Sequence, residues 1–178
     1  MSINKSQNPQ PVASSPTVTN TVTNIETPAV TPTAPVAPAP IPTPTVITEE
    51  EARQVVTNWL NAKSRIFAPP YDRNLAFQLS TGELYNDIVK SNGSLDWLAQ
   101  NNAYYSFSNH SATSLGGFVG NQNDAVILVR VTENKTLFIR GKIDPTQSSS
   151  DVRRVRYFLN RENGTWKIRD FKLIPDRE

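Results

Sequence analysis

The run TEEEARQVVTNWLNAKSRIFAPP, residues 48–70, determines how the folded part of this chain begins. Thr48 and Glu51 have the spacing of a capping box, in which the hydroxyl accepts a hydrogen bond from a free backbone N–H and the carboxylate accepts one from the Thr48 N–H. Pro69 and Pro70 end the pattern. Between these signals, apolar residues recur at helical spacing, at Ala52, Val55, Val56, Trp59, Leu60, Ile66 and Phe67. The run therefore predicts one long amphipathic helix.

The residues before Thr48 differ in composition from the rest of the chain. Residues 1–47 contain ten of the 14 prolines, nine threonines and no aromatic residue. Such a segment cannot bury enough apolar surface to offset the entropy of ordering itself. A spacer is favoured over a ligand for a proline-recognising groove, because no Arg or Lys flanks the prolines of residues 28–44. We predict a disordered Pro/Thr-rich tail or linker over residues 1–47 and one folded domain over residues 48–178.

Composition excludes several classes of protein. A chain without cysteine has no disulfide scaffold, no thiolate zinc site and no cysteine nucleophile. The formal net charge of +2 is small, so nothing indicates a basic stripe for nucleic acid. No apolar run reaches the roughly 18–20 residues of a membrane span, and the N-terminal residues lack the apolar core of a secretory signal. We expect no nucleic-acid partner and no direct membrane span in this chain.

Further helices and then strands are predicted after the first helix. Residues 72–90 show helical spacing with a break at Gly82, and Ser94 is predicted to cap a short helix that carries Leu95, Trp97 and Leu98. After Asn102 the period changes to two, which predicts strands at residues 105–114, 125–132, 136–140, 152–159 and 166–173. Residues 133–135 are interpreted as a tight turn, and the Asn163-Gly164 step as a hairpin turn. The tryptophans Trp59, Trp97 and Trp166 are interpreted as core.

This order of elements predicts an α+β fold, in which N-terminal helices pack on one face of a curved antiparallel sheet. It resembles the nuclear-transport-factor-like (cystatin-like) cone, in which a bent sheet wraps a helix and leaves an open pocket. Concave clefts of this kind are the usual ligand sites. The cone hosts both enzymes and binding modules, so the fold by itself does not decide the function.

Three runs carry a more specific resemblance: TEEEARQVVTNWLNAKSRIFAPPYD, GSLDWLAQNNAYYSF and VRYFLNRENGTWKI. They are similar to the C-terminal, intermembrane-space-type domain of the ARC-type plastid-division protein and its cyanobacterial ZipN-type counterpart, over about residues 47–175. The resemblance implies a domain that lies beyond a single membrane span, away from the FtsZ-tethering J-like region. In chloroplasts this domain grips the C-terminal tail of an outer-envelope division protein. Similar domains also end other cyanobacterial proteins, including some kinases.

This chain shows no J-like region and no span, so the resemblance identifies the module rather than a direct role in division. The expected location is cytoplasmic if the chain is complete. It is the periplasm or the intermembrane-space side if the chain is a piece of a membrane-anchored protein.

Few residues offer catalytic chemistry. His110 is the only histidine, so there is no His–His metal pair and no HExxH motif. The glycines at positions 116, 117 and 120 lack the strand–GxGxxG–helix order of a nucleotide-binding loop. His110 with Asp170, as the acid–base pair of a cone-type enzyme, is kept as an alternative. We predict no catalytic residues, no metal site and no cofactor, and therefore a protein that is not an enzyme.

Two groups of residues have the chemistry of a peptide-binding surface. Tyrosines beside amides combine rigid contact area with hydrogen bonds, and guanidinium groups match carboxylates. Strand alternation places Arg154 and Arg156 on one face. The alternatives are a helix C-cap followed by ordinary strand aromatics, and a solvated strand face paired with Asp or Glu. The predicted partner-binding residues are Asn101, Asn102, Tyr104, Tyr105, Arg140, Arg154 and Arg156.

The sequence therefore predicts a noncatalytic protein-interaction module. Its expected partner is a protein or peptide, either acidic or presenting its C-terminal carboxylate, in cell division or an envelope-associated assembly. That the partner is a peptide rather than a metabolite is implied by the resemblance. A small-molecule-binding or enzymatic cone-fold domain is the alternative, and simple self-association is the third interpretation.

Overall fold

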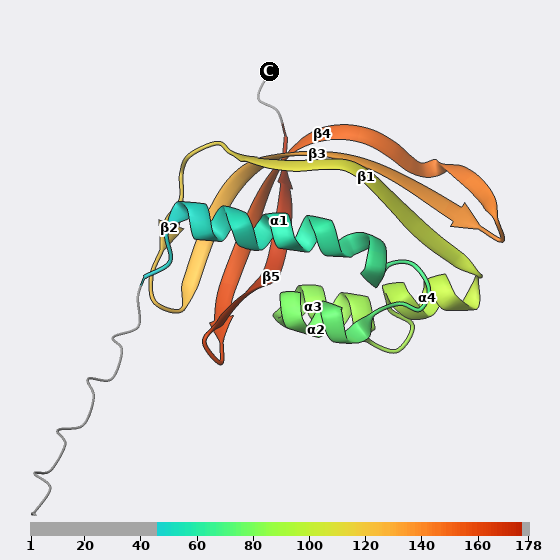
Figure 1. Ribbon diagram of the computed structural model, residues 1–178, viewed down its shortest axis with the longest axis horizontal. Coiled ribbons are helices and arrows are strands. Elements are labelled where there is room, and N and C mark those ends of the chain that lie inside the picture. The colour runs from blue at the N-terminus through green and yellow to red at the C-terminus, as the bar shows by residue number, and fades with distance from the viewer. Residues whose placement is uncertain (1–45, 176–178) are drawn as a thin grey trace, which may run out of the picture. The chain divides into compact units, whose positions relative to one another are not determined.

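The computed structural model describes residues 46–175, so the predicted tail lies almost entirely outside the described residues. The described chain forms four helices and then five strands (Figure 1). This order confirms the predicted α+β class. None of the helices in residues 46–175 has the length and hydrophobicity to cross a membrane. The elements are α1 (Glu49–Ile66), α2 (Arg73–Leu79), α3 (Gly82–Val89), α4 (Ser94–Gln100), β1 (Ala103–Ser114), β2 (Val119–Gly120), β3 (Asp124–Ile139), β4 (Lys142–Glu162) and β5 (Thr165–Ile174).

Helix α1 forms as its sequence predicts. The Glu51 N–H donates to the Thr48 hydroxyl at 3.2 Å, and the Thr48 N–H donates to the Glu51 carboxylate at 2.8 Å, which completes the capping box. The helix ends at Ile66, ahead of Pro69. Its apolar stripe is buried at Ala52, Val56, Trp59, Leu60, Ala62 and Ile66.

The predicted second helical region is interrupted near Gly82, where the chain contacts the edge of the sheet. Ser80 forms an isolated bridge with Ile168 of β5, and the Thr81 N–H donates to the Ile168 carbonyl at 2.9 Å. Helix α3 then begins at Gly82, whose φ of +55° favours glycine. The predicted break is therefore confirmed, and the bridge to β5 accounts for it.

The prediction that Ser94 caps the short helix α4 is wrong. Gly93 is the N-cap, and Ser94 is already the first helical residue. A Cβ atom at position 93 would lie 2.8 Å from the carbonyl oxygens of Asp87 and Lys90, so only glycine fits there. The Ser94 hydroxyl instead donates to the Asp87 carbonyl at 3.3 Å.

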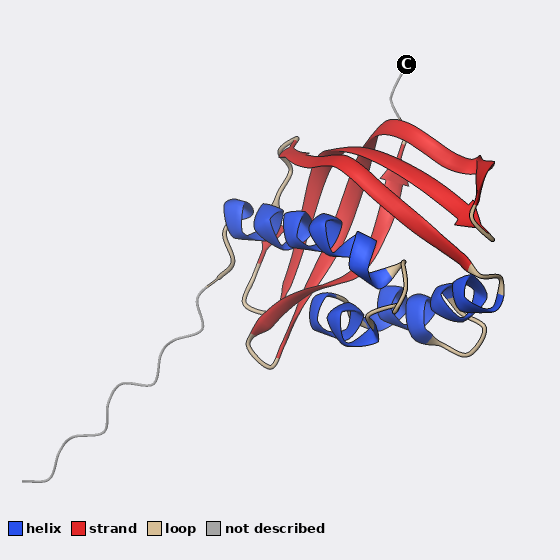
Figure 2. Cartoon of the chain, turned by 45° about the vertical axis from the view of Figure 1, so that its right-hand side comes forward, coloured by secondary structure: helices blue, strands red, loops and turns tan. Residues whose placement is uncertain are grey.

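The strands form one antiparallel sheet in the order β1-β3-β4-β5, with β2 paired to β3. The sheet bends over α1, and all the helices lie on the same side of it (Figure 2). Residues 125, 127, 129 and 131 of β3 point to this inner face and are buried, whereas their neighbours point outward. The curved sheet with helices on one face is as predicted, while the nuclear-transport-factor-like cone stays a prediction.

The predicted turn at residues 133–135 is wrong, because β3 continues through them. Glu133 pairs with Asp151 of β4, and Lys135 pairs with Phe107 of β1, so both edges of this segment are hydrogen-bonded. The real turn is at Arg140 and Gly141, with φ values of +52° and +77°. Strand β4 consequently begins at residue 142, ten residues before the predicted start. The predicted hairpin turn at residues 163–164 is confirmed, with both φ values positive.

The three tryptophans do not share one environment. Trp59 is 4% exposed and meets the ring of Phe67 edge-to-face, with ring centroids 6.3 Å apart. Trp166 is half-buried against the core. Trp97 is 45% exposed, because Leu95 and Leu98 occupy the buried side of α4. The prediction that Trp97 belongs to the core is therefore wrong.

We expect Trp59→Ala to lower the free energy of unfolding by about 3–5 kcal/mol, since it empties a buried aromatic site. Trp166→Ala should cost less because the side chain is half-buried, and Trp97→Ala should change stability by no more than about 0.5 kcal/mol. Urea denaturation of the three variants measures these values. Equal losses in Trp59→Ala and Trp97→Ala would contradict the burial described here.

Candidate partner-binding cleft

Five of the predicted site residues gather at one end of the sheet. Asn101 is the C-cap residue of α4, and the Asn102 carbonyl accepts a hydrogen bond from the Arg140 N–H at 2.9 Å. Tyr104 and Tyr105 open β1 but point to opposite faces. Tyr104 stacks outward on Phe138 with ring centroids 4.8 Å apart.

The other two predicted residues, Arg154 and Arg156, lie elsewhere. Both point to the outer face of the sheet, which confirms the predicted alternation, since Val155 between them and Tyr157 after Arg156 are buried on the inner face. Arg154 lies opposite Arg130 of β3, and Arg130 lies opposite Thr113 of β1. From Thr113 to Tyr104 along β1 is roughly 30 Å at the rise of an extended strand. The structure therefore separates the arginines from the tyrosines.

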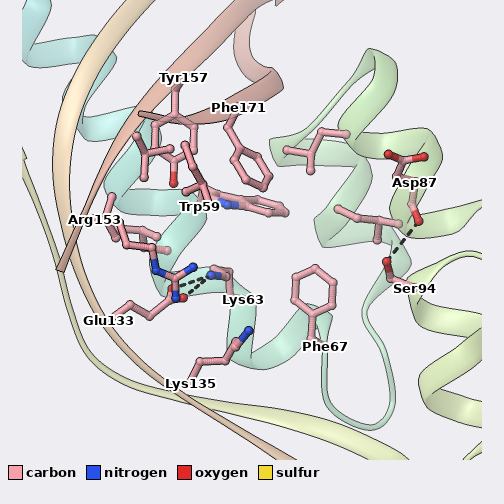
Figure 3. Close-up of a pocket in the computed structure, with 16 residues that line it drawn as sticks. Trp59, Lys63, Phe67, Asp87, Ser94, Glu133, Lys135, Arg153, Tyr157 and Phe171 are labelled. Carbon is pink, nitrogen blue, oxygen red and sulfur yellow. Dashed lines mark hydrogen bonds and ion pairs between the residues drawn. The ribbon is translucent and has the colours of Figure 1, made fainter. Parts of the chain in front are cut away.

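A cavity of about 360 Å³ lies between the helices and the inner face of the sheet. A second hollow of about 550 Å³ adjoins it, because Phe67, Asp87 and Ser94 line both. We call the two together the cleft. Figure 3 shows side chains of α1, β3 and β4 converging on the first cavity. The second hollow is also lined by Trp97 and Tyr105, which form an aromatic mouth.

A buried ion pair lies in the inner part of the cleft. Lys63 Nζ of α1 donates to both carboxylate oxygens of Glu133 of β3, at 2.7 and 2.5 Å (Figure 3). Burial lowers the pKa of Lys63 below its ordinary value, although the Glu133 carboxylate favours the charged ammonium. The positive charges of Lys135 and Arg153 lower the Lys63 pKa further. Three cations, Lys63, Lys135 and Arg153, and two carboxylates, Asp87 and Glu133, line this first cavity.

Two more cations stand beside this pair. Arg153 of β4 lines the cavity and forms an ion pair of 2.7 Å with Asp151. Lys135 of β3 lies with its Nζ 5.3 Å from the centre of the Tyr105 ring. Within residues 46–175, Lys135 has no carboxylate at ion-pair distance. An anionic ligand in the cleft would therefore meet an unpaired ammonium group beside an aromatic ring.

The walls of the cleft are apolar and aromatic. Trp59, Val131, Val155 and Tyr157 surround the charged group, and Phe171 of β5 contacts the Tyr157 ring at a centroid distance of 6.0 Å. Burial, together with the nearby Glu133 carboxylate, raises the pKa of Tyr157, so its hydroxyl stays protonated. This combination of apolar walls and a few charged groups is typical of a binding site.

Of these residues that line the cleft, the sequence analysis singled out Tyr105 but not Lys63, Lys135 or Arg153. A signal existed for Lys135: in a continuous strand it falls on the same face as Val131 and Glu133. The incorrect turn at residues 133–135 hid that alternation. Helical spacing also gave a signal for Lys63, which lies four residues after Trp59 and three before Ile66 and so falls on the apolar stripe of α1.

The alternative acid–base pair is not formed. His110 Nε2 lies 2.6 Å from the Asn61 side-chain oxygen of α1. Asp170 lies on β5, three strands from β1, where its carboxylate accepts the Phe171 N–H at 2.7 Å. Strand spacing alone separates them by roughly 14 Å. Within the described residues, no three His, Asp or Glu side chains gather into a metal-ligand group.

We expect Lys63→Met to lower the free energy of unfolding by about 3–5 kcal/mol, because it leaves the Glu133 carboxylate buried and unpaired. The double variant Lys63→Met/Glu133→Leu should recover most of that loss, since both charges are then gone. Chemical denaturation of the single and double variants gives the coupling energy. Lys90→Met, which breaks the exposed pair with Asp87, is the matched control and should cost less than about 1 kcal/mol. Additive losses would contradict the coupling.

Comparisons with known proteins agree with this fold. The profile of the ARC6-like, IMS domain matches residues 52–169. The chain is similar to the crystal structure of the intermembrane space region of chloroplast protein ARC6, with 17% identity, 72% of this chain and 97% of that chain covered, and a TM-score of 0.56. At that identity the likeness shows the fold. No curated protein matches the chain. Because the profile spans most of the described residues, the resemblance expected from the sequence is confirmed and the chain belongs to the ARC6-like, IMS domain family.

Proposed function

We propose that this domain is a noncatalytic protein-interaction module that holds an anionic segment of a partner protein in the cleft. The observation that carries the proposal is the Lys135 ammonium group, which forms no ion pair within residues 46–175 and lies inside a cleft with an aromatic mouth. Membership of the family makes the domain division-related, and the partner is accordingly a protein of a plastid-type or cyanobacterial-type division or envelope assembly.

The charges of the cleft favour a carboxylate as the anchoring group. Lys135 is unpaired among the described residues, and Arg153 forms its ion pair with Asp151, which leaves the cleft with an excess of positive charge. A C-terminal carboxylate or an acidic side chain would neutralise this excess. A charge-assisted hydrogen bond of this kind contributes about 1.5–3 kcal/mol.

The aromatic mouth supplies the apolar part of the contact. Trp97 is exposed although it is large, and its helix is held in place by Leu95 and Leu98. An exposed tryptophan beside a half-buried tyrosine, as Trp97 and Tyr105 are here, has the composition of a binding hot spot. Asn101 donates its side-chain amide to the Trp97 carbonyl at 2.8 Å. Asn102 and Arg140 lie at the same end of the sheet and remain proposed contacts of the rim.

One observation favours a small-molecule ligand as the second candidate. The inner cavity alone has about 360 Å³ and apolar walls around the Lys63–Glu133 pair, which is a volume suited to a small ligand. In this pair each group already satisfies the other. The second candidate is therefore a small carboxylate that binds in this cavity at Lys135 and is not chemically changed there.

The test is selection from a library of random heptapeptides displayed with free carboxyl termini. The selected peptide, labelled with fluorescein at its N-terminus, is titrated by fluorescence anisotropy. Lys135→Ala should weaken binding about tenfold, the lower end of one charge-assisted contact, and Trp97→Ala should weaken it by about the same factor because a hot-spot side chain is lost. Lys142→Ala removes an exposed lysine outside the cleft and should leave the affinity unchanged.

Three outcomes decide the proposal. The proposal is overturned if no peptide is selected. It is also overturned if Lys135→Ala and Trp97→Ala both bind the selected peptide as tightly as the unchanged chain does. If the C-terminally amidated peptide binds more weakly, the C-terminal carboxylate is the anchoring group. If it binds equally well, an acidic side chain of the peptide is the anchoring group. Benzoate or succinate that binds more tightly than the peptide would support the small-molecule candidate instead.

A further inference from the structure

The outer face of the sheet, opposite the cleft, carries four neighbouring cations. We call this group the outer basic face; it consists of Arg130 of β3, Arg154 and Arg156 of β4, and Lys172 of β5. Arg130 lies directly opposite Arg154, and Arg156 lies directly opposite Lys172. Arg154 and Arg156 are two positions apart and project from the same face. The charges therefore form one compact patch across three adjacent strands.

This arrangement costs stability. Like charges directly opposite one another in a sheet repel, and the outer basic face contains two such pairs. In residues 46–175 none of the four has a carboxylate at ion-pair distance, whereas Arg53, Arg73 and other surface cations do. The nearest acid on this face, Asp170, lies opposite Phe158 and accepts its hydrogen bond from the Phe171 N–H. Within the described residues, no ion pair offsets this repulsion.

Apolar side chains lie among the cations on the same face. Leu128 is opposite Arg156, and Phe158 follows Arg156 at the next outward position. Lys172 Nζ lies 5.6 Å from the centre of the Phe158 ring. Both apolar side chains are half-buried. Arginine with aromatic and aliphatic neighbours is the composition of a protein interface.

We propose that the outer basic face is a second docking surface, which binds an extended acidic segment of a partner protein. By strand geometry the Cβ atoms of Arg130 and Arg154 stand about 5 Å apart across the strands, and those of Arg154 and Arg156 about 7 Å apart along β4. Carboxylates at alternate positions of an extended chain have the second spacing, and each fits the fork of an arginine. With the cleft on the inner face, one domain could hold two partner segments at once.

A protein segment is favoured over a duplex or a bilayer by the size of the patch. Four cations on three strands match a few carboxylates, while the formal net charge of the whole chain is only +2. Nucleic acid and anionic membranes attract proteins through many phosphates over a larger area. Binding at the outer basic face does not depend on the cleft, because the two surfaces share no residue.

The test uses the full chain and a fluorescein-labelled decapeptide of alternating Glu and Thr, blocked at both ends so that it has no terminal carboxylate. At about 50 mM salt, where screening is weak, the anisotropy should report binding that the Gln-Thr counterpart lacks. Arg154→Glu/Arg156→Glu should weaken it by about tenfold or more, since two attractive contacts become repulsive. Lys142→Glu, an exposed change of the same sign elsewhere on β4, is the matched control and should have little effect.

A second measurement separates binding from folding. Arg154→Thr should raise the melting temperature by about 1–4 °C, because it removes a like-charge pair. The same change should lower the affinity for the Glu-Thr peptide. A purely structural patch would instead lose stability. The proposal is overturned if Arg154→Glu/Arg156→Glu leaves the affinity for the peptide unchanged. It is also overturned if Lys135→Ala abolishes binding of the peptide. Tighter binding to vesicles with about 30% anionic lipid, or to duplex DNA, than to the peptide overturns it as well.

Discussion

The ion pair between Lys63 and Glu133 links the two layers of this fold. Lys63 belongs to the helix that carries the largest part of the helical core, and Glu133 belongs to the strand that pairs with both β1 and β4. A buried pair of this kind adds little net stability, because desolvation offsets most of the attraction, but losing either partner is costly. Here it joins α1 to β3 through two contacts, from Lys63 Nζ to the Glu133 carboxylate oxygens at 2.7 and 2.5 Å.

The position of this pair shapes the cleft. Since Glu133 neutralises only Lys63, the neighbouring Lys135 has an aromatic ring beside it in place of a carboxylate partner. Burial is the main cause of the lowered Lys63 pKa, and the nearby positive charges lower it further. This arrangement underlies the proposal that the cleft binds a segment with negative charge. The Lys63 ammonium group and the Glu133 carboxylate in this cavity bind each other.

The sheet presents different chemistry on its two faces because strand side chains alternate. On β4, Arg153 faces the cleft while Arg154 and Arg156 face outward, although the three are close in sequence. A shift of one residue in the pairing of β3 with β4 would exchange the two sets. The register that buries Val155 and Tyr157 therefore also decides which arginines serve which surface. In this chain the same packing constraint controls the core and both candidate binding surfaces.

Local signals in the sequence determined the helices, the fold class, the family and the hairpin at Asn163-Gly164. The capping box, the stripe on α1 and the Asn-Gly step act over a few residues, so their effects can be predicted without tertiary contacts. Tertiary structure decided the rest. Residues 133–135 resemble a turn in isolation, but pairing on both edges and the contact with Lys63 keep them in a strand. The cleft depends on that long strand, and the exposure of Trp97 depends on which side of α4 meets the core, so neither could be read from spacing alone.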